Sequence, residues 1–483
     1  MLESPLLPQT RSLIAGEWTD GGEGTLLRVK NPATGELLAE IPEAGARDAR
    51  RAIESARASM ALVPDPGRRA LYLNRIHELL LENREDLARI ITLEQGKPLR
   101  ESHIEVEYTA AFFRFFAGRT DLLDPHPFAV PNSPLRWVVH HRPVGVVAMI
   151  TPWNLPLAML GKKFAAALLA GCGVVSKPAP ETPLSAIALF ALAERAGIPS
   201  GLVNLVVGPA EPIGVELCSH PAVRVISFTG STEVGKLLIR RSADSVKRVS
   251  LELGGNAPFI VFEDADLELA VESLMVNKFR CAGQTCICAN RVFVHETLAS
   301  ELLMRLRDKL PKLVVGNGMD PATDIGPLID PSAWEKVDSL VKDALSKGAK
   351  LAHGGNPDRP RGSDWGAFYP PTLIVGANEG MRLFHEEIFG PVIAVTTFRE
   401  EEEVLARANS SQHGLAGYVF TKDAARGTRM VTKLQCGHVG LNSSSGPTPS
   451  APFGGMKASG IGREGGAEGL MEYLETQTVV EGI

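Results

Sequence analysis

The chain has 483 residues, with 50 basic and 56 acidic side chains and a formal net charge of −6. This acidic balance argues against a protein that binds nucleic acid through a basic surface, and 44% apolar residues exclude global disorder. Six cysteines are too few for a disulfide framework, and no apolar stretch approaches the roughly 18 residues that span a bilayer. The first residues lack the pattern of a secretory leader, so we expect a cytoplasmic protein.

The first 142 residues combine short extended runs with long helical stretches. Up to residue 45, turn signals separate short β-like runs. Helical periodicity follows over residues 46–62, in one long stretch over 67–94, and again over 98–116. Four prolines between residues 121 and 134 predict an extended connection, and residues 135–142 predict an exposed strand. The His140–His141 pair in this strand has no further ligand at metal-binding spacing, so no metal is predicted.

From residue 143 onward, strands and helices alternate. Short β-branched runs at 144–150, 173–176, 202–206, 223–228 and 246–251 are separated by helical segments, and a second set runs from residue 259 to 421. This rhythm predicts two α/β domains in series, each a parallel sheet with helices on both faces. The glycine- and proline-rich stretch over 354–366 is predicted to be a surface loop.

Cys286 is the first candidate for chemistry. It lies in the loop sequence GQTCIC, after a predicted helix and beside polar side chains. Most cysteines are buried and inert, as we expect for Cys172, Cys218 and Cys436, but a cysteine in this setting can act as a nucleophile. Together with Cys288 it could also bind a metal, but no second pair stands at ligand distance, so zinc is not expected.

Glu252 is a candidate general base. It stands between two leucines at the end of an apolar strand, where loss of water would raise the pKa of its carboxyl group. The alternative is a strand-end glutamate that faces solvent. The following Gly254 and Gly255 favour a functional role, because glycines let a ligand approach the backbone.

The sequence FTGSTEVG at 228–235 follows a predicted strand and opens a predicted helix. Backbone N–H groups at such a helix start bind phosphates. The spacing is GxxxxG and not the GxGxxG of the usual dinucleotide motif. Lys236 follows the second glycine as in a P-loop, but Leu237 occupies the position of the required hydroxyl. We therefore reject a P-loop and predict a loop of the dinucleotide-binding type.

Taken in order, these motifs resemble the aldehyde dehydrogenase superfamily, with the succinate-semialdehyde dehydrogenase branch as the closest match. The matching segments are TPWN at 151–154, SKPA at 176–179, FTGSTEVG at 228–235, LELGGNAPFIVFEDADL at 251–267, AGQTCICANR at 282–291, EEIFGPV at 386–392 and PFGGMKASGIGREGG at 452–466. The resemblance covers nearly the whole chain. It implies a doubly wound α/β fold with two Rossmann-like domains: an NAD(P)-binding domain (1–120 and 144–253) and a catalytic domain (254–458). A small β arm (121–143 and 471–483) is implied to mediate homodimer or homotetramer formation.

The resemblance also implies the chemistry. Cys286 attacks the aldehyde to give a thiohemiacetal, and Asn154 with the Cys286 amide stabilises the oxyanion. Hydride passes to the nicotinamide, and Glu252 activates the water that hydrolyses the thioester. CoA-acylating relatives lack this glutamate. The residues implied to bind NAD or NADP are Ile150, Trp153, Lys177, Gly230, Ser231, Gly235, Glu387 and Phe389.

The implied substrate site departs from that branch. The branch clamps a carboxylate with two arginines and a serine, and the corresponding positions here hold Arg280, Lys162 and the Pro447–Thr448 pair. Lysine is a point charge and lacks the planar fork of arginine. The remaining implied pocket residues are mostly apolar: Leu155, Met159, Ile287 and Phe453. We predict a semialdehyde such as succinate semialdehyde; the alternatives are a broad-range aliphatic or aromatic aldehyde dehydrogenase and a non-catalytic family member.

Three further departures bear on the predicted site. Cys281 replaces the asparagine that usually precedes AGQTC. Pro180 replaces a glutamate that repels the 2′-phosphate in NAD-preferring relatives, and Glu181 comes one residue later, so NAD and NADP both remain open. Cys288 is a candidate redox partner of Cys286. The alternative, a neighbouring cysteine with no redox role, stays open.

Overall fold

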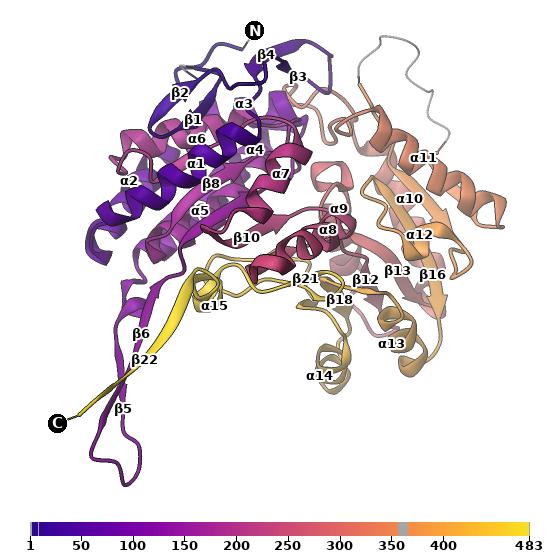
Figure 1. Cartoon of the computed structure of the whole chain (residues 1–483). Helices are drawn as coiled ribbons and strands as arrows, with labels where there is room; N and C mark the ends of the chain where they lie inside the picture. The colour runs from indigo at the N-terminus through magenta and orange to yellow at the C-terminus, as the bar shows by residue number, and fades with distance from the viewer. Residues whose placement is uncertain (1, 8, 356–365, 483) are drawn as a thin grey trace.

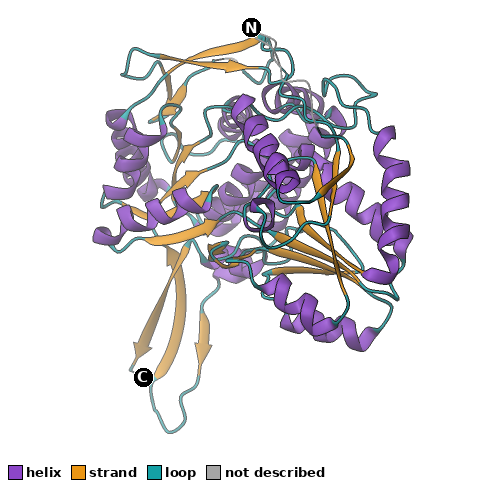
Figure 2. Ribbon diagram, turned by 90° about the vertical axis from the view of Figure 1, so that its right-hand side faces the viewer, coloured by secondary structure: helices purple, strands orange, loops and turns teal. Residues whose placement is uncertain are grey.

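The computed structural model of this chain describes residues 2–7, 9–355 and 366–482. Its strands gather into two large sheets and a projecting three-stranded sheet (Figure 1). Helices flank the strands in two perpendicular views (Figure 2), so the predicted doubly wound α/β class is confirmed. The loop predicted over 354–366 lies almost entirely outside the described residues.

The first large sheet has eight strands in the order β2-β1-β9-β8-β7-β10-β11-β21. Its five central strands are parallel, and the flanking strands pair antiparallel. The strands are β1 (Ser12–Ile14), β2 (Glu17–Thr19), β7 (Val146–Ile150), β8 (Gly173–Lys177), β9 (Val203–Leu205), β10 (Val223–Thr229), β11 (Arg248–Glu252) and β21 (Gly460–Ile461). The helices of this half are α1 (Ala46–Ser59), α2 (Pro66–Glu82), α3 (Arg84–Gln95), α4 (Leu99–Ala117), α5 (Pro156–Ala170), α6 (Leu184–Arg195), α7 (Ala210–Ser219) and α8 (Thr232–Ser242).

The second large sheet has seven strands in the order β14-β15-β16-β13-β12-β18-β19, parallel except for β14. Its strands are β12 (Ala257–Val261), β13 (Ala289–His295), β14 (Lys350–His353), β15 (Thr372–Val375), β16 (Val392–Phe398), β18 (Ala416–Phe420) and β19 (His438–Leu441). Its helices are α9 (Leu267–Phe279), α10 (Glu296–Lys309), α11 (Pro331–Ser346), α12 (Arg382–His385), α13 (Glu401–Asn409) and α14 (Ala424–Lys433). The smaller remaining elements are β3 (Leu26–Lys30), β4 (Leu37–Pro42), β17 (His413–Gly414), β20 (Met456–Lys457) and α15 (Gly466–Met471).

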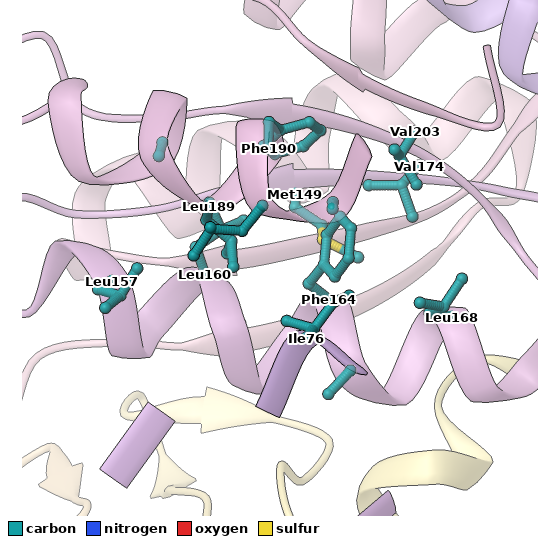
Figure 3. Packing of buried hydrophobic residues seen from close by; sticks show 14 of the residues in the cluster. Ile76, Met149, Leu157, Leu160, Phe164, Leu168, Val174, Leu189, Phe190 and Val203 are labelled. Atoms are coloured by element: carbon teal, nitrogen blue, oxygen red, sulfur yellow. The ribbon is translucent and has the colours of Figure 1, made fainter. Parts of the chain in front are cut away.

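Both faces of the first sheet are packed. Successive residues of a strand point to opposite faces, and along β7 Ala148 belongs to one buried cluster while Met149 belongs to another. On the Met149 face, Phe164 of α5 meets Phe190 of α6 edge to face, with ring centroids 5.4 Å apart (Figure 3). A sheet covered on both faces explains the continuous apolar runs in the sequence.

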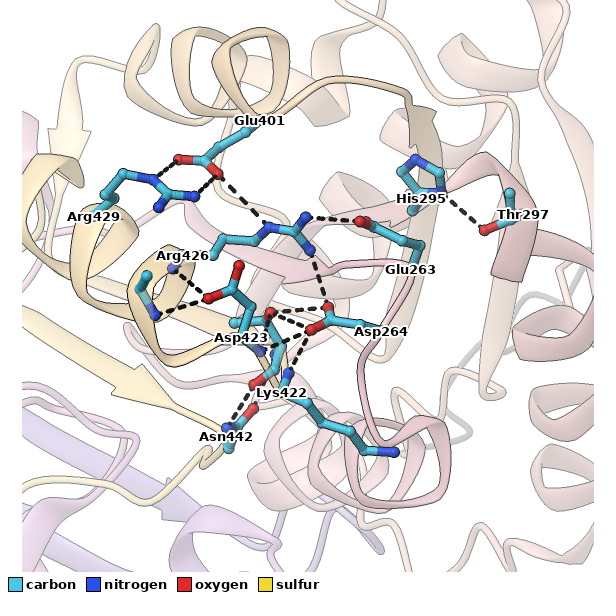
Figure 4. Close-up of polar contacts among 12 residues, drawn as sticks. Glu263, Asp264, His295, Thr297, Glu401, Lys422, Asp423, Arg426, Arg429 and Asn442 are labelled. Carbon is cyan, nitrogen blue, oxygen red and sulfur yellow. Dashed lines mark hydrogen bonds and ion pairs between the residues drawn. The ribbon is translucent and has the colours of Figure 1, made fainter.

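Ionic contacts join the outer helices of the second sheet. Arg426 of α14 bonds Asp264 at 3.0 Å and Glu263 at 2.7 Å, and Arg429 bonds Glu401 of α13 at 2.7 Å (Figure 4). The Arg426 guanidinium also lies over the ring of Phe262, 4.6 Å from its centroid. This cluster holds α13 and α14 against the strand ends that follow β12 and β18.

The three-stranded sheet projects from the body at the opposite end from the N-terminus (Figures 1 and 2). Its strands are β5 (His126–Phe128), β6 (Arg136–Pro143) and β22 (Leu474–Glu481). β22 pairs antiparallel with β6 along its whole length, from Leu474 opposite Pro143 to Glu481 opposite Arg136. The strand expected over 135–142 is therefore present, and it pairs with β22 on one side and with β5 on the other.

The structure corrects several expectations about single elements. The stretch over 67–94 is two helices, because Asn83 leaves the helical conformation between α2 and α3 and its side chain bonds the carbonyl of Leu79 at 2.7 Å. The strand expected from residue 246 begins at Arg248, because Val246 has a left-handed backbone with φ of 50°. The strands β14 and β19 and the helices α11 and α14 were not predicted. In α14 only Gly427 and Met430 are buried, which leaves almost no apolar periodicity to detect.

Candidate active site

The carboxyl ends of four parallel strands bring predicted site residues to one edge of the first sheet. Ile150 at the end of β7 is in register with Lys177 of β8 and with Phe228 of β10. The next residue of β10 is in register with Glu252 of β11. Open α/β sheets bind their ligands at this edge.

A cavity of about 450 Å³ lies beside this edge, between residues of the two large sheets. Its volume is in the range of small-molecule sites, roughly 300–1,000 Å³. Fifteen residues anticipated from the sequence line it: Trp153, Asn154, Leu155, Met159, Lys162, Gly230, Ser231, Glu252, Arg280, Cys286, Ile287, Glu387, Phe389, Pro447 and Phe453. Five anticipated residues are outside the lining: Ile150, Lys177, Gly235, Cys288 and Thr448.

Cys286 is presented on a loop with a tight approach to the first sheet. Before it, Cys281 and Ala282 both adopt left-handed backbones, with φ of 53° and 54°, which is strained for residues that carry a Cβ. A Cβ on Gly255 would lie 2.1 Å from the carbonyl oxygen of Cys286, so this approach requires glycine. The pKa of the half-buried Cys286 thiol is raised to about 12, mainly by burial and then by Glu387.

Glu252 is buried without a hydrogen-bond partner. Its side chain is at the end of β11, and neither carboxylate oxygen bonds any part of the described chain. Burial raises the pKa of this carboxyl well above its usual value, and the nearby Glu464 carboxylate raises it further. Native proteins rarely leave a buried polar group unsatisfied, so such a group needs an explanation, for example a role at a site. A carboxyl with a raised pKa in a cavity is suited to proton transfer.

Asn154 enters the same cavity from the loop between β7 and α5. Its side-chain Nδ2 donates to the carbonyl of Gln284 at 2.9 Å, and its Oδ1 accepts from the amide of Leu155 at 3.0 Å. Gln284 is two residues before Cys286, so the asparagine is tied directly to the cysteine loop. Its second Nδ2 hydrogen has no partner among the described residues.

The loop between β10 and α8 has the features of a phosphate-binding segment. Ser231 caps α8 (its Oγ accepts the amide of Val234 at 3.3 Å), and Gly230 donates to the carbonyl of Glu252 at 3.0 Å. Gly235 lies within α8 itself, where a Cβ would be 2.5 Å from Leu253, so this glycine brings the helix close to the sheet. An N-terminus of this kind favours an anion.

Two aromatic rings and a carboxylate form the wall on the other side. Trp153 and Phe389 meet edge to face, with ring centroids 5.6 Å apart. Phe389 has φ of 54°, a strained conformation that clusters at ligand sites. Glu387 accepts the amide of Gly255 at 3.0 Å, and burial raises the pKa of its carboxyl to about 7.

Lys177 is close to the cavity but is not part of its lining. Its ammonium donates to the carbonyl of Pro178 at 3.0 Å, and burial lowers its pKa to about 8. The Glu181 carboxylate partly offsets this lowering, so its charge reaches Lys177 although it is displaced by one residue in sequence.

The two cations expected to hold a substrate anion differ in their surroundings. Lys162 forms an ion pair with Glu464, which also pairs with Lys163, and its ammonium is 5.6 Å from the centroid of Phe453. The guanidinium of Arg280 makes no hydrogen bond or ion pair within the described chain, and its Nε is buried. Of these two cations, Arg280 is thus the one with unused donors. Thr448, expected nearby, is exposed and outside the lining.

The comparisons with known proteins agree with this arrangement. The model of the Aldehyde dehydrogenase family matches residues 18–479. The chain is 46% identical to 3-sulfolactaldehyde dehydrogenase of Pseudomonas putida, covering 100% of this chain and 99% of that protein. It is 44% identical to succinate-semialdehyde dehydrogenase (NADP+) GabD of Escherichia coli, covering 98% of both. A crystal structure of betaine aldehyde dehydrogenase from Staphylococcus aureus in complex with NAD+ superposes with a TM-score of 0.94 at 37% identity, covering 98% of this chain and 95% of that one.

The chain belongs to the aldehyde dehydrogenase family. It is an oxidoreductase that oxidises an aldehyde with NAD or NADP. The capped N-terminus of α8, the aromatic pair and the nearby Lys177 suit the phosphates, ring and ribose of such a cofactor. Among the described residues, no helix is long and apolar enough to cross a membrane, and no cluster of His, Cys, Asp or Glu is arranged to hold a metal ion.

Sequence reasoning missed several residues of this aldehyde dehydrogenase site. Lys97, Glu101, Glu105 and Tyr108 line the cavity from α4 and the turn before it, but in sequence they are ordinary charged and aromatic positions of a helical stretch. Glu464 lies within the matching segment PFGGMKASGIGREGG, and that match was the signal that could have identified it. Its neighbours in space, Lys162 and Lys163, are about 300 residues away in the sequence.

Proposed function

We propose that this aldehyde dehydrogenase oxidises an aldehyde that carries an anionic group at its far end, such as succinate semialdehyde, to the corresponding acid. The observation that carries the proposal is the unpaired guanidinium of Arg280 in the wall of the cavity that also contains Cys286. The Nε of Arg280 is buried without a hydrogen-bond partner among the described residues, and an unsatisfied buried donor is unfavourable, so a ligand that supplies an anion gains from pairing with it. The names of two relatives, a 3-sulfolactaldehyde and a succinate-semialdehyde dehydrogenase, also refer to anionic aldehydes.

In the proposed reaction, Cys286 supplies the nucleophile. The thiol first loses its proton to solvent, and its sulfur then forms a bond to the aldehyde carbon as the C=O π bond opens. The carbonyl oxygen becomes an oxyanion that accepts hydrogen bonds from Asn154 Nδ2 and the Cys286 amide. When bound against Trp153, Phe389 and the N-terminus of α8, NAD or NADP would supply the acceptor for the hydride of this carbon. The acyl group is then held on Cys286 as a thioester.

Glu252 is proposed to act in the second half of the reaction. Its carboxylate takes a proton from water as the water oxygen attacks the thioester carbon, and the bond from carbon to Cys286 then breaks. The departing sulfur takes the proton from Glu252, so the products are the carboxylic acid, the free thiol and the regenerated Glu252 carboxylate. Because the Glu252 carboxylate has no hydrogen-bond partner among the residues that the structure describes, it is available to a water molecule.

The alternative substrate class is an uncharged aliphatic or aromatic aldehyde. Leu155, Met159, Ile287 and Phe453 give the cavity an apolar part that supports this class. On that alternative, Arg280 would have no role in substrate recognition.

Replacing the two proposed catalytic residues should block different steps. We expect Cys286→Ala to abolish hydride transfer while cofactor binding, followed by fluorescence quenching, stays intact. Glu252→Gln should give one rapid turnover of NADH or NADPH and then stall, because the thioester accumulates. Stopped-flow absorbance at 340 nm distinguishes the two. Normal steady-state turnover by Glu252→Gln would contradict the assignment of the base.

The raised pKa of Glu252 should appear in the pH dependence of deacylation. The base acts as the carboxylate, so the steady-state rate of an enzyme limited by thioester hydrolysis should rise with pH as Glu252 loses its proton. The residual hydrolysis by Glu252→Gln should lack this titration. A wild-type deacylation rate that falls as pH rises from 6 to 9 would be incompatible with the proposal.

Substrate preference tests the role of Arg280. We expect kcat/KM to be higher for succinate semialdehyde than for butanal, and Arg280→Leu to lower the semialdehyde value by roughly 10- to 100-fold, the range for a lost charged hydrogen bond. Butanal is the matched control, since it lacks only the carboxylate and should respond little to this change. A preference for benzaldehyde, with an unchanged semialdehyde value in Arg280→Leu, would favour the alternative class.

We also propose that the chain forms a homodimer or homotetramer through its projecting sheet. β5 and β22 are the two edges of this sheet, and Phe128 and Val480 on them are 46% and 44% exposed. Exposed edges of this kind are best covered by another chain. Light scattering at micromolar concentration should give a mass of at least twice 51.8 kDa. A single species at the mass of one chain would rule this out.

A further inference from the structure

A buried ion pair in the cavity wall is not used by the proposed reaction. Lys97 lies in the turn between α3 and α4, and its ammonium is 2.5 Å from the carboxylate of Glu105, within α4. Both side chains are 1% exposed. Burying two charges costs free energy unless their remaining hydrogen-bonding capacity is also satisfied. The partners that satisfy it therefore indicate what the pair holds in place.

Those partners lie in the segment that carries Asn154. The ammonium of Lys97 donates to the backbone carbonyl of Asn154 at 2.7 Å. The second carboxylate oxygen of Glu105 accepts the amides of Leu157 and Ala158, at 3.0 and 3.2 Å, in the first turn of α5. The pair thus fixes both the peptide of Asn154 and the helix start that follows it.

The orientation of the Asn154 amide depends on this backbone position. Its Oδ1 accepts from Leu155 and its Nδ2 donates one hydrogen to Gln284. A side-chain amide has two N–H hydrogens, so one remains for a ligand in the cavity. A shift of the Asn154 backbone would change where that hydrogen points.

The turn at Lys97 also reaches the cysteine loop. Gln95 donates to the sulfur of Cys281 at 3.3 Å, and Glu101 accepts the amide of Cys281 at 2.7 Å. The Cys281 thiol in turn donates to the same Asn154 carbonyl that Lys97 contacts, at 3.5 Å. One turn of the chain therefore holds both Asn154 and the loop that contains Cys286.

We propose that Lys97 and Glu105 are positioning residues that hold Asn154 where it can donate to the oxyanion formed at Cys286. The inference rests on the proposed function, since it assigns Asn154 that role. Preorganised donors stabilise a transition state only if they are already placed when charge develops. A displacement of about 1 Å can lower a rate by roughly 100-fold.

The test compares one double substitution in two backgrounds. Lys97→Met with Glu105→Gln removes both charges together, so no unpaired ion is buried, and the glutamine can still accept amides from α5. We expect the first-turnover rate of NADH or NADPH formation to fall by roughly 10- to 100-fold, with the dissociation constant of the cofactor unchanged. In Asn154→Ala, which has no amide left to position, the same double substitution should change this rate by less than about twofold.

Glu94→Gln is the matched control for a purely structural role. Glu94 is also a fully buried glutamate, and it accepts the amides of Leu184 and Ser185 at the start of α6, at 2.7 and 2.9 Å, away from the cavity lining. It should lower the melting temperature without lowering the first-turnover rate.

Three outcomes would overturn the inference. An unchanged rate in the Lys97→Met/Glu105→Gln enzyme rejects it directly. An equal loss of rate with and without Asn154 shows that the pair acts by another route. An unaffected rate in Asn154→Ala rejects the inference together with the oxyanion role in the proposed function, which distinguishes that failure from the other two.

Discussion

The site depends on one close approach between backbones. The carbonyl oxygen of Cys286 lies against Gly255 with no room for a Cβ, and Gly255 is three residues beyond Glu252 at the end of β11. The same segment continues into β12, an inner strand of the second sheet. The connection between the two sheets is therefore also the wall against which the cysteine loop packs. The position of the cysteine loop relative to Glu252 therefore depends on the short backbone segment between β11 and β12.

Two buried glutamates, Glu252 and Glu464, and the half-buried Glu387 lie near this wall in different electrostatic surroundings. Glu464 is paired with two lysines, which lower its pKa. Glu387 bonds a backbone amide, and burial raises its pKa to about 7. The Glu252 carboxylate has no hydrogen-bond partner within the described part of the chain, and its pKa is raised well above its usual value. When the surroundings give carboxyl groups different pKa values, each group can serve a different purpose. Here Glu464 is an ion-pair partner, Glu387 a hydrogen-bond acceptor and Glu252 the proposed base.

Much of this arrangement follows from sequence because it lies where strands end. The parallel rhythm of strands and helices predicted the sheet, and Ile150, Lys177 and Glu252 reach one edge because parallel strands in register share that edge. Lys97 and Glu105 could not be found in this way. A charged residue in a helical stretch has the same pattern whether it faces solvent or a buried partner, and only the packing of α4 against α5 decides between them.

The break between α2 and α3 and the ion pairs of Glu464 escaped prediction for related reasons. Asn83 is compatible with a helix interior by propensity, and its bond to the Leu79 carbonyl becomes visible only in three dimensions. Glu464 lies about 300 residues from Lys162 and Lys163, so no local spacing relates them. Sequence periodicity records the burial of apolar faces, whereas both of these contacts are polar and those of Glu464 are also long-range.

The position of Lys162 also bears on how the proposed anion site would discriminate. A pair of arginines offers two planar forks that match a carboxylate. Here one of the two positions is a lysine whose charge is already engaged by Glu464, so a single fork, that of Arg280, remains. A single guanidinium with unused donors attracts any terminal anion but discriminates little between anions of different shape. With the proposed function, the enzyme would still select aldehydes that carry a negative charge. Discrimination between a planar carboxylate and a tetrahedral sulfonate would then depend on the apolar residues around Arg280.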